Sequence, residues 1–219
     1  PEDLDAILVT HEHKDHIHGV GVLARKYGMD IYANEKTWQI MDSKNMLGKI
    51  DNSQKHVFSR DKLLTFGDID IESFGVSHDA IDPQFYRFMK DGKSFVMLTD
   101  TGYVSDRLAG IVADADGYLI ESNHDVEILR AGSYAWRLKQ RILSDLGHLS
   151  NEDGADAMIR TLGNRTKKIY LGHLSKENNI KELAHMTMEN QLARADLAVG
   201  HDFEVLDTSP DTATPLTKI

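Results

Sequence analysis

The stretch Ala6-Ile7-Leu8-Val9-Thr10-His11-Glu12-His13-Lys14-Asp15-His16 places four metal-binding side chains within six residues, directly after an apolar run. A strand over the apolar run would present these side chains in a turn at the edge of a sheet. His11 and His13 can then reach one metal ion, while Asp15 and His16 face a second. Imidazole and carboxylate ligands suit zinc, manganese or iron better than calcium. The pattern predicts metal-assisted hydrolysis, in which a bound metal ion makes hydroxide near neutral pH.

A chance cluster of histidines in a surface loop is the alternative, because the sequence contains 11 histidines among 219 residues. The interleaved acids and the preceding strand do not fit an engineered histidine tag. Chance matches of this spacing directly after a strand are rare, which favours the metal site.

Composition indicates a soluble globular protein, with 41% hydrophobic and 27% charged residues. We expect one domain over residues 1–207 and a C-terminal tail over 208–219. No apolar run approaches the roughly 20 residues that span a membrane. The absence of cysteine excludes disulfides, thiolate metal ligands and a cysteine nucleophile. With no visible signal peptide, these features favour the cytoplasm, and they leave the oligomeric state open.

Hydrophobic periodicity predicts a mixed α/β protein without repeats. Two hairpins are expected to turn at Gly67-Asp68 and at Asp91-Gly92. Ser150 should begin a helix, with Asp153 completing an approximate capping box. The predicted strands are 5–10, 30–33, 62–66, 69–74, 84–89, 94–98, 118–121, 168–171 and 203–206, and the predicted helices are 17–27, 35–46, 135–146, 151–162 and 180–194.

Three further metal-binding side chains, His78, Asp100 and His173, follow apolar strands. Each alone has an ordinary explanation, as a hydrogen-bonded surface histidine or a turn aspartate. Strand ends hold side chains rigidly, as a site for two metal ions requires. Together with the cluster over residues 11–16, these three complete the ligand count for two ions.

The run from His11 to His16 resembles the His-x-His-x-Asp-His signature of the metallo-β-lactamase superfamily. Over residues 3–207 the chain is similar to the branch of metal-dependent hydrolases that contains YycJ, WalJ and VicX. The similarity is carried by Ser77-His78-Asp79-Ala80, Leu98-Thr99-Asp100-Thr101-Gly102, Glu121-Ser122-Asn123-His124-Asp125, Gly147-His148-Leu149-Ser150-Asn151 and Gly172-His173-Leu174-Ser175. The resemblance implies an αββα sandwich with the metal site at one edge. That fold normally begins with a strand hairpin before the histidine motif, which we expect this chain to lack.

The same resemblance implies which residues bind the two divalent metal ions. They are His11, His13 and His78 for the first ion, Asp15, His16 and His173 for the second, and Asp100 as the bridge. Members of the branch are regarded as metal-dependent 5′-to-3′ exonucleases acting on DNA, and the branch is linked to a cell-wall two-component system. The implied activity is hydrolysis of phosphodiester bonds.

Two residues are candidates for proton transfer in that reaction. Asp15 can orient the nucleophile or accept its proton. His148 precedes the helix that begins at Ser150, in a position that resembles the auxiliary histidine of related tRNA-processing nucleases, and it can protonate the leaving 3′-oxygen. Packing at the helix start is the alternative for His148. His124 is a candidate phosphate contact or partner of a metal ligand.

The net charge of −10 is unfavourable to a polyanion, so a nucleic-acid substrate needs a local basic patch. The best basic cluster lies in one predicted helix and its approach, where Arg137 and Arg141 are the candidate substrate contacts. Its other members are Arg130 and Lys139, interleaved with Tyr134 and Trp136. These residues can grip a DNA backbone and stack a base. The alternative is a solvated helix face with one buried tryptophan.

Three functions remain open from the sequence. The first is a DNA exonuclease, favoured by the basic cluster and the resemblance. The second is a hydrolase of small esters, thioesters or lactones on the same metal site, favoured by the acidic net charge. The third is a non-catalytic module that keeps metal only for folding, which the complete ligand set disfavours.

Overall fold

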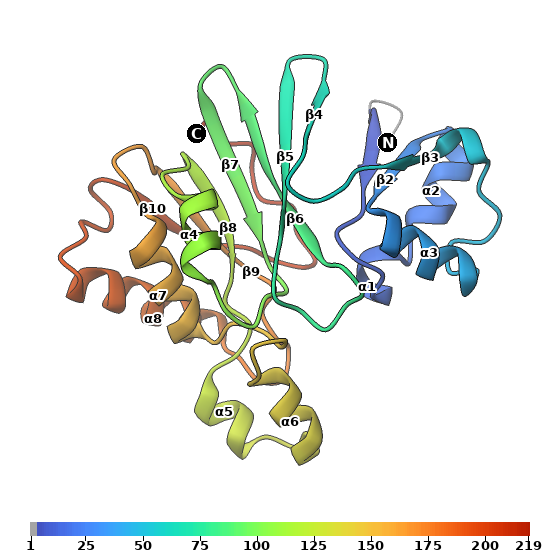
Figure 1. The fold of residues 1–219 in the computed structure, drawn as a ribbon. Helices are drawn as coiled ribbons and strands as arrows, with labels where there is room; N and C mark the ends of the chain where they lie inside the picture. The colour runs from blue at the N-terminus through green and yellow to red at the C-terminus, as the bar shows by residue number, and fades with distance from the viewer. Residues whose placement is uncertain (1–3) are drawn as a thin grey trace. The chain divides into compact units, whose positions relative to one another are not determined.

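The computed structural model describes residues 4–219, which form two compact units (Figure 1). The first unit comprises residues 4–75 and 79–85, and the second comprises residues 76–78 and 86–219. Both are mixed α/β structures in which helices flank a sheet. Between residues 4 and 219 no helix is long and apolar enough to cross a membrane. The single domain expected over residues 1–207 stays a prediction.

The first unit is built on a parallel sheet of three strands in the order β1-β2-β3. The strands are β1 (Ala6–Leu8), β2 (Asp30–Ala33) and β3 (Lys55–Val57), and the helices are α1 (Lys14–Ile17), α2 (Val20–Tyr27), α3 (Glu35–Ser43) and the 3₁₀ turn η1 (Asn52–Gln54). The predicted hairpin at Gly67-Asp68 is confirmed, with β4 (Leu63–Phe66) antiparallel to β5 (Ile69–Gly75). One predicted boundary is wrong. The helix expected over 17–27 is two helices, and the first begins inside the histidine motif.

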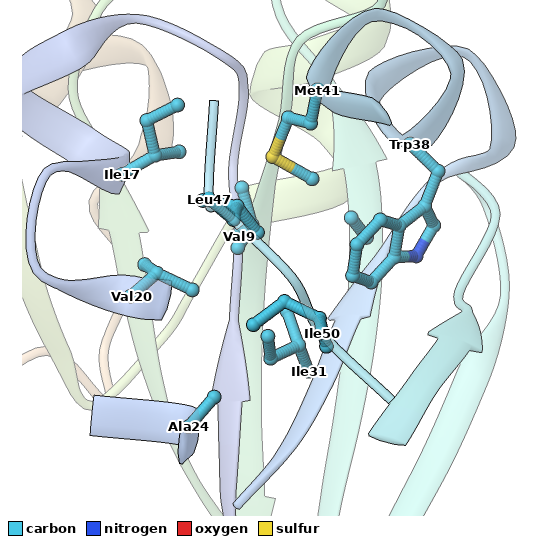
Figure 2. Packing of buried hydrophobic residues seen from close by; sticks show 10 residues of the cluster. Val9, Ile17, Val20, Ala24, Ile31, Trp38, Met41, Leu47 and Ile50 are labelled. Carbon is cyan, nitrogen blue, oxygen red and sulfur yellow. The ribbon is translucent and has the colours of Figure 1, made fainter. Parts of the chain in front are cut away.

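The core of the first unit lies between its sheet and its helices, as Figure 2 shows. Val20 and Ala24 are spaced by four residues on one face of α2, and together with Ile17 at the end of α1 they point into this core. Ile31 of β2 is fully buried there, and burial of such a side chain contributes about 1.5–3 kcal/mol. Trp38 is 6% exposed and donates its indole N–H to the carbonyl of His56. The core therefore fixes β1, from whose end the histidine motif extends.

The second unit is built on a sheet in which β10, β9, β8 and β7 are parallel neighbours in that order. The strands are β6 (Gln84–Lys90), β7 (Lys93–Leu98), β8 (Gly117–Glu121), β9 (Lys168–Gly172) and β10 (Glu204–Asp207). β6 pairs antiparallel with β7 from Tyr86 onward, which confirms the second predicted hairpin. Its turn residues Asp91 and Gly92 both have positive φ, as a two-residue turn of this kind requires.

Helices of the second unit are α4 (Asp106–Val112), α5 (Val126–Ala131), α6 (Trp136–Ile142), α7 (Asn151–Thr161) and α8 (Lys181–Arg194). α7 packs against α4, α8 and β8, and α8 also packs against β10. α5 and α6 lie together, away from those three helices (Figure 1). Ser150 accepts a hydrogen bond from the backbone N–H of Asp153, which confirms the predicted start of α7. The segment after β10 has no helix or strand, but Thr208 and Thr217 hydrogen-bond to Leu171 and Tyr170 of β9.

Candidate functional site

Three acidic and imidazole side chains lie at the carboxyl ends of neighbouring parallel strands of the second unit. Asp100 follows β7, Glu121 is the last residue of β8, and His173 follows β9. Parallel strands end at a common sheet edge, where α/β proteins place their ligands. The Nε2 atom of His173 lies 3.5 Å from Oδ1 of Asp100. The structure therefore brings together two predicted metal ligands, Asp100 and His173, which lie 73 residues apart in the sequence. It also adds an acid, Glu121, that was not predicted as a site residue.

Glu121 is the buried centre of this group. Its Oε1 atom accepts hydrogen bonds from Nδ1 of His148 at 2.8 Å and from Nδ1 of His173 at 2.7 Å. Its Oε2 atom accepts from the backbone N–H groups of Thr101 at 3.0 Å and Leu149 at 3.3 Å. Burial opposes the charge of Glu121, but hydrogen bonds from His148 and His173 outweigh it and hold the pKa of this carboxyl below its ordinary value.

The predicted residues His78 and His148 join the same group. His78 is buried, its Nδ1 atom lies 3.1 Å from the carbonyl oxygen of Gly147, and its Nε2 atom lies 3.8 Å from Oδ1 of Asp100. The Nδ1 atom of His148 lies 3.5 Å from the same Asp100 oxygen. Four of the predicted site residues, His78, Asp100, His148 and His173, therefore form one cluster in the second unit.

Two members of the cluster have a strained backbone. Asp100 and His173 have φ angles of 48° and 58°, in the left-handed region that residues other than glycine rarely adopt. Such conformations cost about 1–3 kcal/mol each and persist where their surroundings enforce them. The side chain of Asn123 donates to the carbonyl of His173 at 2.8 Å and holds that conformation. Strain at two predicted ligands is consistent with a functional role for both.

In the first unit, the histidine motif is organised around Thr10. The hydroxyl of Thr10 lies 3.0 Å from Nδ1 of His11 and 3.1 Å from Nδ1 of His16, and a hydroxyl can donate to one ring while accepting from the other. The rings of His11 and His13 are 4.6 Å apart. Asp15 and His16 lie in helix α1 rather than in the predicted turn, because the chain becomes helical at residue 14. Asp15 is 68% exposed.

These donors fit divalent metal ions. Metal-binding histidines characteristically use one ring nitrogen for the ion and the other for a hydrogen bond that fixes the ring. Here the Nδ1 atoms of five histidines are held: His11 and His16 by Thr10, His78 by Gly147, and His148 and His173 by Glu121. Each ring therefore presents Nε2. Within the second unit, ligand atoms of Asp100, Glu121, His148 and His173 all lie within 4.8 Å of one another, as a metal site requires.

The predicted basic cluster is only partly a surface feature. Arg137 and Arg141 are exposed on α6. The prediction that Lys139 contacts the substrate is wrong. Its side chain is 7% exposed, and its ammonium group donates to the carbonyls of Arg130 and Gly132 at the end of α5. Trp136 is 64% exposed, so the burial of the tryptophan in the alternative is wrong, whereas a solvated helix face remains open. The helix is also shorter than predicted, over Trp136–Ile142 rather than 135–146.

The predicted contact His124 lies just beyond β8 and is 1% exposed. Neither of its ring nitrogens has a hydrogen-bond partner among residues 4–219, and both are closed to solvent. Burial lowers the pKa of His124, with Glu121 opposing that effect, so the ring is neutral at physiological pH. His18 is exposed on the surface, whereas His185 is paired with Asp207 and Glu189.

Comparison with known proteins identifies the family. Residues 1–174 match the model of the beta-lactamase superfamily domain. The whole chain is 84% identical to the Streptococcus pneumoniae protein named exodeoxyribonuclease WalJ and spans 81% of it. It is also 52% identical over 214 residues, 98% of this chain and 80% of the relative, to exodeoxyribonuclease YycJ of Bacillus anthracis.

A solved structure supports the same fold. The metallo-β-lactamase fold protein YhfI of Bacillus subtilis superposes with a TM-score of 0.68 at 20% identity, over 94% of this chain and 76% of that one. The expected fold class is thereby confirmed. The chain belongs to the metallo-β-lactamase superfamily and, within it, to the YycJ and WalJ branch of metal-dependent hydrolases.

Proposed function

We propose that this protein is an exonuclease that hydrolyses the phosphodiester bonds of DNA from the 5′ end, with divalent metal ions as cofactors. The names of the two relatives, at 84% and 52% identity, support DNA as the substrate. The observation that carries the proposal is the buried Glu121 carboxylate, hydrogen-bonded to both His148 and His173 beside Asp100. The one carboxylate can thereby orient both the proposed metal ligand, His173, and the proposed proton donor, His148.

We further propose two metal ions, zinc, manganese or iron, with the ligand set that the family resemblance implies. The ligands are His11, His13 and His78 for one ion, Asp15, His16 and His173 for the other, and Asp100 for both. When bound, such ions supply a water nucleophile of lowered pKa and positive charge that stabilises the phosphoryl oxygens. The fixed Nδ1 atoms described above support His11, His16, His78 and His173 as ligands through Nε2.

The chain's own contribution to catalysis is proton transfer and orientation. Attack of water on phosphorus breaks the bond to the 3′-oxygen, which must gain a proton as it leaves. His148 donates its Nδ1 proton to the Glu121 carboxylate in a hydrogen bond, so only Nε2 can give a proton to the substrate. The buried carboxylate stabilises the positive charge of the imidazolium that donates. Asp15, exposed at α1, orients the attacking water and accepts its proton.

The test is hydrolysis of end-labelled DNA by protein reconstituted with zinc or manganese. Stepwise release of nucleotides by the native protein, and its loss in Asp100→Ala, is the expected result, and the position of the label reads the direction of cleavage. Asp211→Ala, in the exposed segment after β10, is the matched control and should cleave normally. A protein that binds metal but does not cleave DNA contradicts the proposal. It would favour a hydrolase of small esters, thioesters or lactones, which the net charge of −10 also favours.

A further inference from the structure

One face of α6 exposes an aromatic ring beside basic side chains. Trp136, Gln140 and Leu143 are spaced by four and three residues and are all exposed, so they form one stripe. Arg137 and Arg141 are exposed next to it, whereas Leu138, Lys139 and Ile142 face the protein. We call the exposed set the α6 platform, and it consists of Trp136, Arg137, Gln140, Arg141 and Leu143. A tryptophan that is 64% exposed on such a surface is typical of a binding site.

The platform is joined directly to the catalytic cluster of the second unit. The backbone N–H of His148 donates to the carbonyl of Ile142, the last residue of α6, at 3.0 Å. The carbonyl of Gly147 lies 3.1 Å from Nδ1 of His78, and the hydroxyl of Ser77 donates to the carbonyl of Asp145 at 2.7 Å. The short turn after α6 thus carries the proton donor and holds a metal ligand. A DNA strand on the platform would therefore lie beside the cluster.

Charge identifies the kind of ligand that suits this surface. Two of the platform's five residues, Arg137 and Arg141, are basic and none is acidic, in a chain whose net charge is −10. The platform therefore offers a polyanion local positive charge that the net charge of the chain does not provide. An exposed indole face can stack only on a base that is not already stacked on both sides within a duplex.

We infer that the α6 platform binds unpaired nucleotides, with Trp136 stacking on a base and Arg137 contacting a phosphate. This inference rests on the proposed function for its choice of DNA, and it adds that the nucleotides held at the platform are unpaired. Arg141, on the same face of the helix as Arg137, adds positive charge where the DNA backbone would lie. The indole supplies affinity without reading the sequence, because every base has a stacking face.

A fluorescence titration without metal tests the platform separately from cleavage. The chain has two tryptophans, and Trp38 is buried in the core of the first unit, so a nucleotide that stacks on the protein quenches Trp136. In the presence of a chelator, a single-stranded oligonucleotide should quench the native protein. Trp136→Phe should lose the quenching while it retains binding by anisotropy of a labelled oligonucleotide. A blunt duplex should quench little at the same concentration.

Variants then connect the platform to turnover. Trp136→Ala should raise KM for DNA with an unpaired end on the order of ten-fold, the range of one lost base stack, with kcat nearly unchanged, and Trp136→Phe should restore part of the loss. Arg137→Ala should weaken binding and reduce the slope of log Kd against log salt by about one. Arg194→Ala, on the exposed surface of α8, removes the same charge away from the platform. It should change neither the affinity for DNA nor the dependence of Kd on salt.

The outcomes separate the two proposals. Normal quenching by single strands in a protein that never cleaves DNA would contradict the exonuclease but support the platform. Cleavage that is unaffected by Trp136→Ala, with no quenching by any oligonucleotide, would overturn the platform and leave the exonuclease in place. A protein partner would then be the occupant of α6. Equal quenching by blunt duplex and single strand would overturn the preference for unpaired nucleotides.

Discussion

Glu121 accepts a hydrogen bond from Nδ1 of His148 at 2.8 Å, through an oxygen that also accepts from His173. Because all four donors around the carboxylate need an acceptor, an amide at this position would turn an NH₂ group toward at least one of them. We expect Glu121→Gln to lower cleavage and metal affinity by about 10–100-fold, the usual effect of removing a carboxylate that orients a metal-binding histidine. Steady-state cleavage and metal titration measure the two effects.

The control for this substitution is Glu127→Gln, which removes an exposed carboxylate from α5. It should alter cleavage by less than two-fold. Cleavage by Glu121→Gln within two-fold of the native rate, with unchanged metal affinity, would show that the buried carboxylate does not position either histidine.

His148 and His173 share one carboxylate oxygen, but we assign them different tasks. His148→Ala should lower kcat by about 10²–10⁴-fold, the range for general acid catalysis, and leave the metal content per chain unchanged. His173→Ala should lower the metal content as well as kcat, because it removes a proposed ligand. Elemental analysis after dialysis, combined with single-turnover cleavage, distinguishes the two. Loss of metal from His148→Ala would make His148 a ligand instead of a proton donor.

The sequence was sufficient to predict the strands whose ends carry the cluster, because buried parallel strands are continuous apolar runs. It also located His78, Asp100 and His173 by their position after those runs. Glu121 follows the apolar residues of β8 in the same way, but it was read only as part of a family motif and not as a site residue. The same criterion, applied to every strand end, would have selected it.

Burial and local hydrogen bonds account for the predictions that were wrong about Lys139 and about the end of α6. Lys139 has the charge of a DNA contact, but the turn between α5 and α6 leaves carbonyls that its ammonium group satisfies, and a sequence pattern cannot show this. Helix α6 ends at Ile142 because the backbone N–H of His148 takes the carbonyl of that residue. The helical turn of α1 was not predicted for a different reason: Lys14–Ile17 is too short to show a periodic pattern.

Gly147 is a position where the proposed catalytic cluster depends on space around the backbone. A Cβ atom there would lie 2.1 Å from the carbonyl oxygen of Ile142 and 2.3 Å from that of Arg141. Neither backbone oxygen can move without shifting the turn that carries His148. We expect Gly147→Ala to lower stability by about 2 kcal/mol or more and to lower cleavage by more than the unfolded fraction explains. Urea denaturation and cleavage at a temperature where the variant is folded measure both.

Gly110→Ala is the matched control, because it places the same methyl group in helix α4 with nothing within 4 Å of the new Cβ atom. It should stabilise the protein by about 0.5–1 kcal/mol, the helix propensity difference, and leave cleavage unchanged. Equal stability and activity in the two variants would mean that the turn after α6 is free to move.

His185 joins α8 to β10 through a charge that depends on pH. Its Nδ1 atom lies 2.9 Å from Asp207, its Nε2 atom lies 3.4 Å from Glu189, and Lys181 lies 3.7 Å from the other oxygen of Asp207. Burial lowers the pKa of His185, but the hydrogen bond and the charge of Asp207, with the charge of Glu189, outweigh it and raise the pKa above 6.5. The folded state therefore holds the proton more tightly than the unfolded state.

The charged form of His185 contributes stability that is complete below about pH 6.5 and is lost as the pH rises through the raised folded-state pKa. His185→Gln should therefore lower the free energy of unfolding at pH 5.5–6 by up to about 1 kcal/mol, the range for a partly exposed ion pair, and by less at pH 8.5. His201→Gln, whose pair with Asp202 is largely exposed, should show no comparable trend. Urea denaturation across this pH range measures the difference, and a deficit of His185→Gln that grew with pH would contradict the assignment, because it would mean that α8 and β10 are held by the neutral ring.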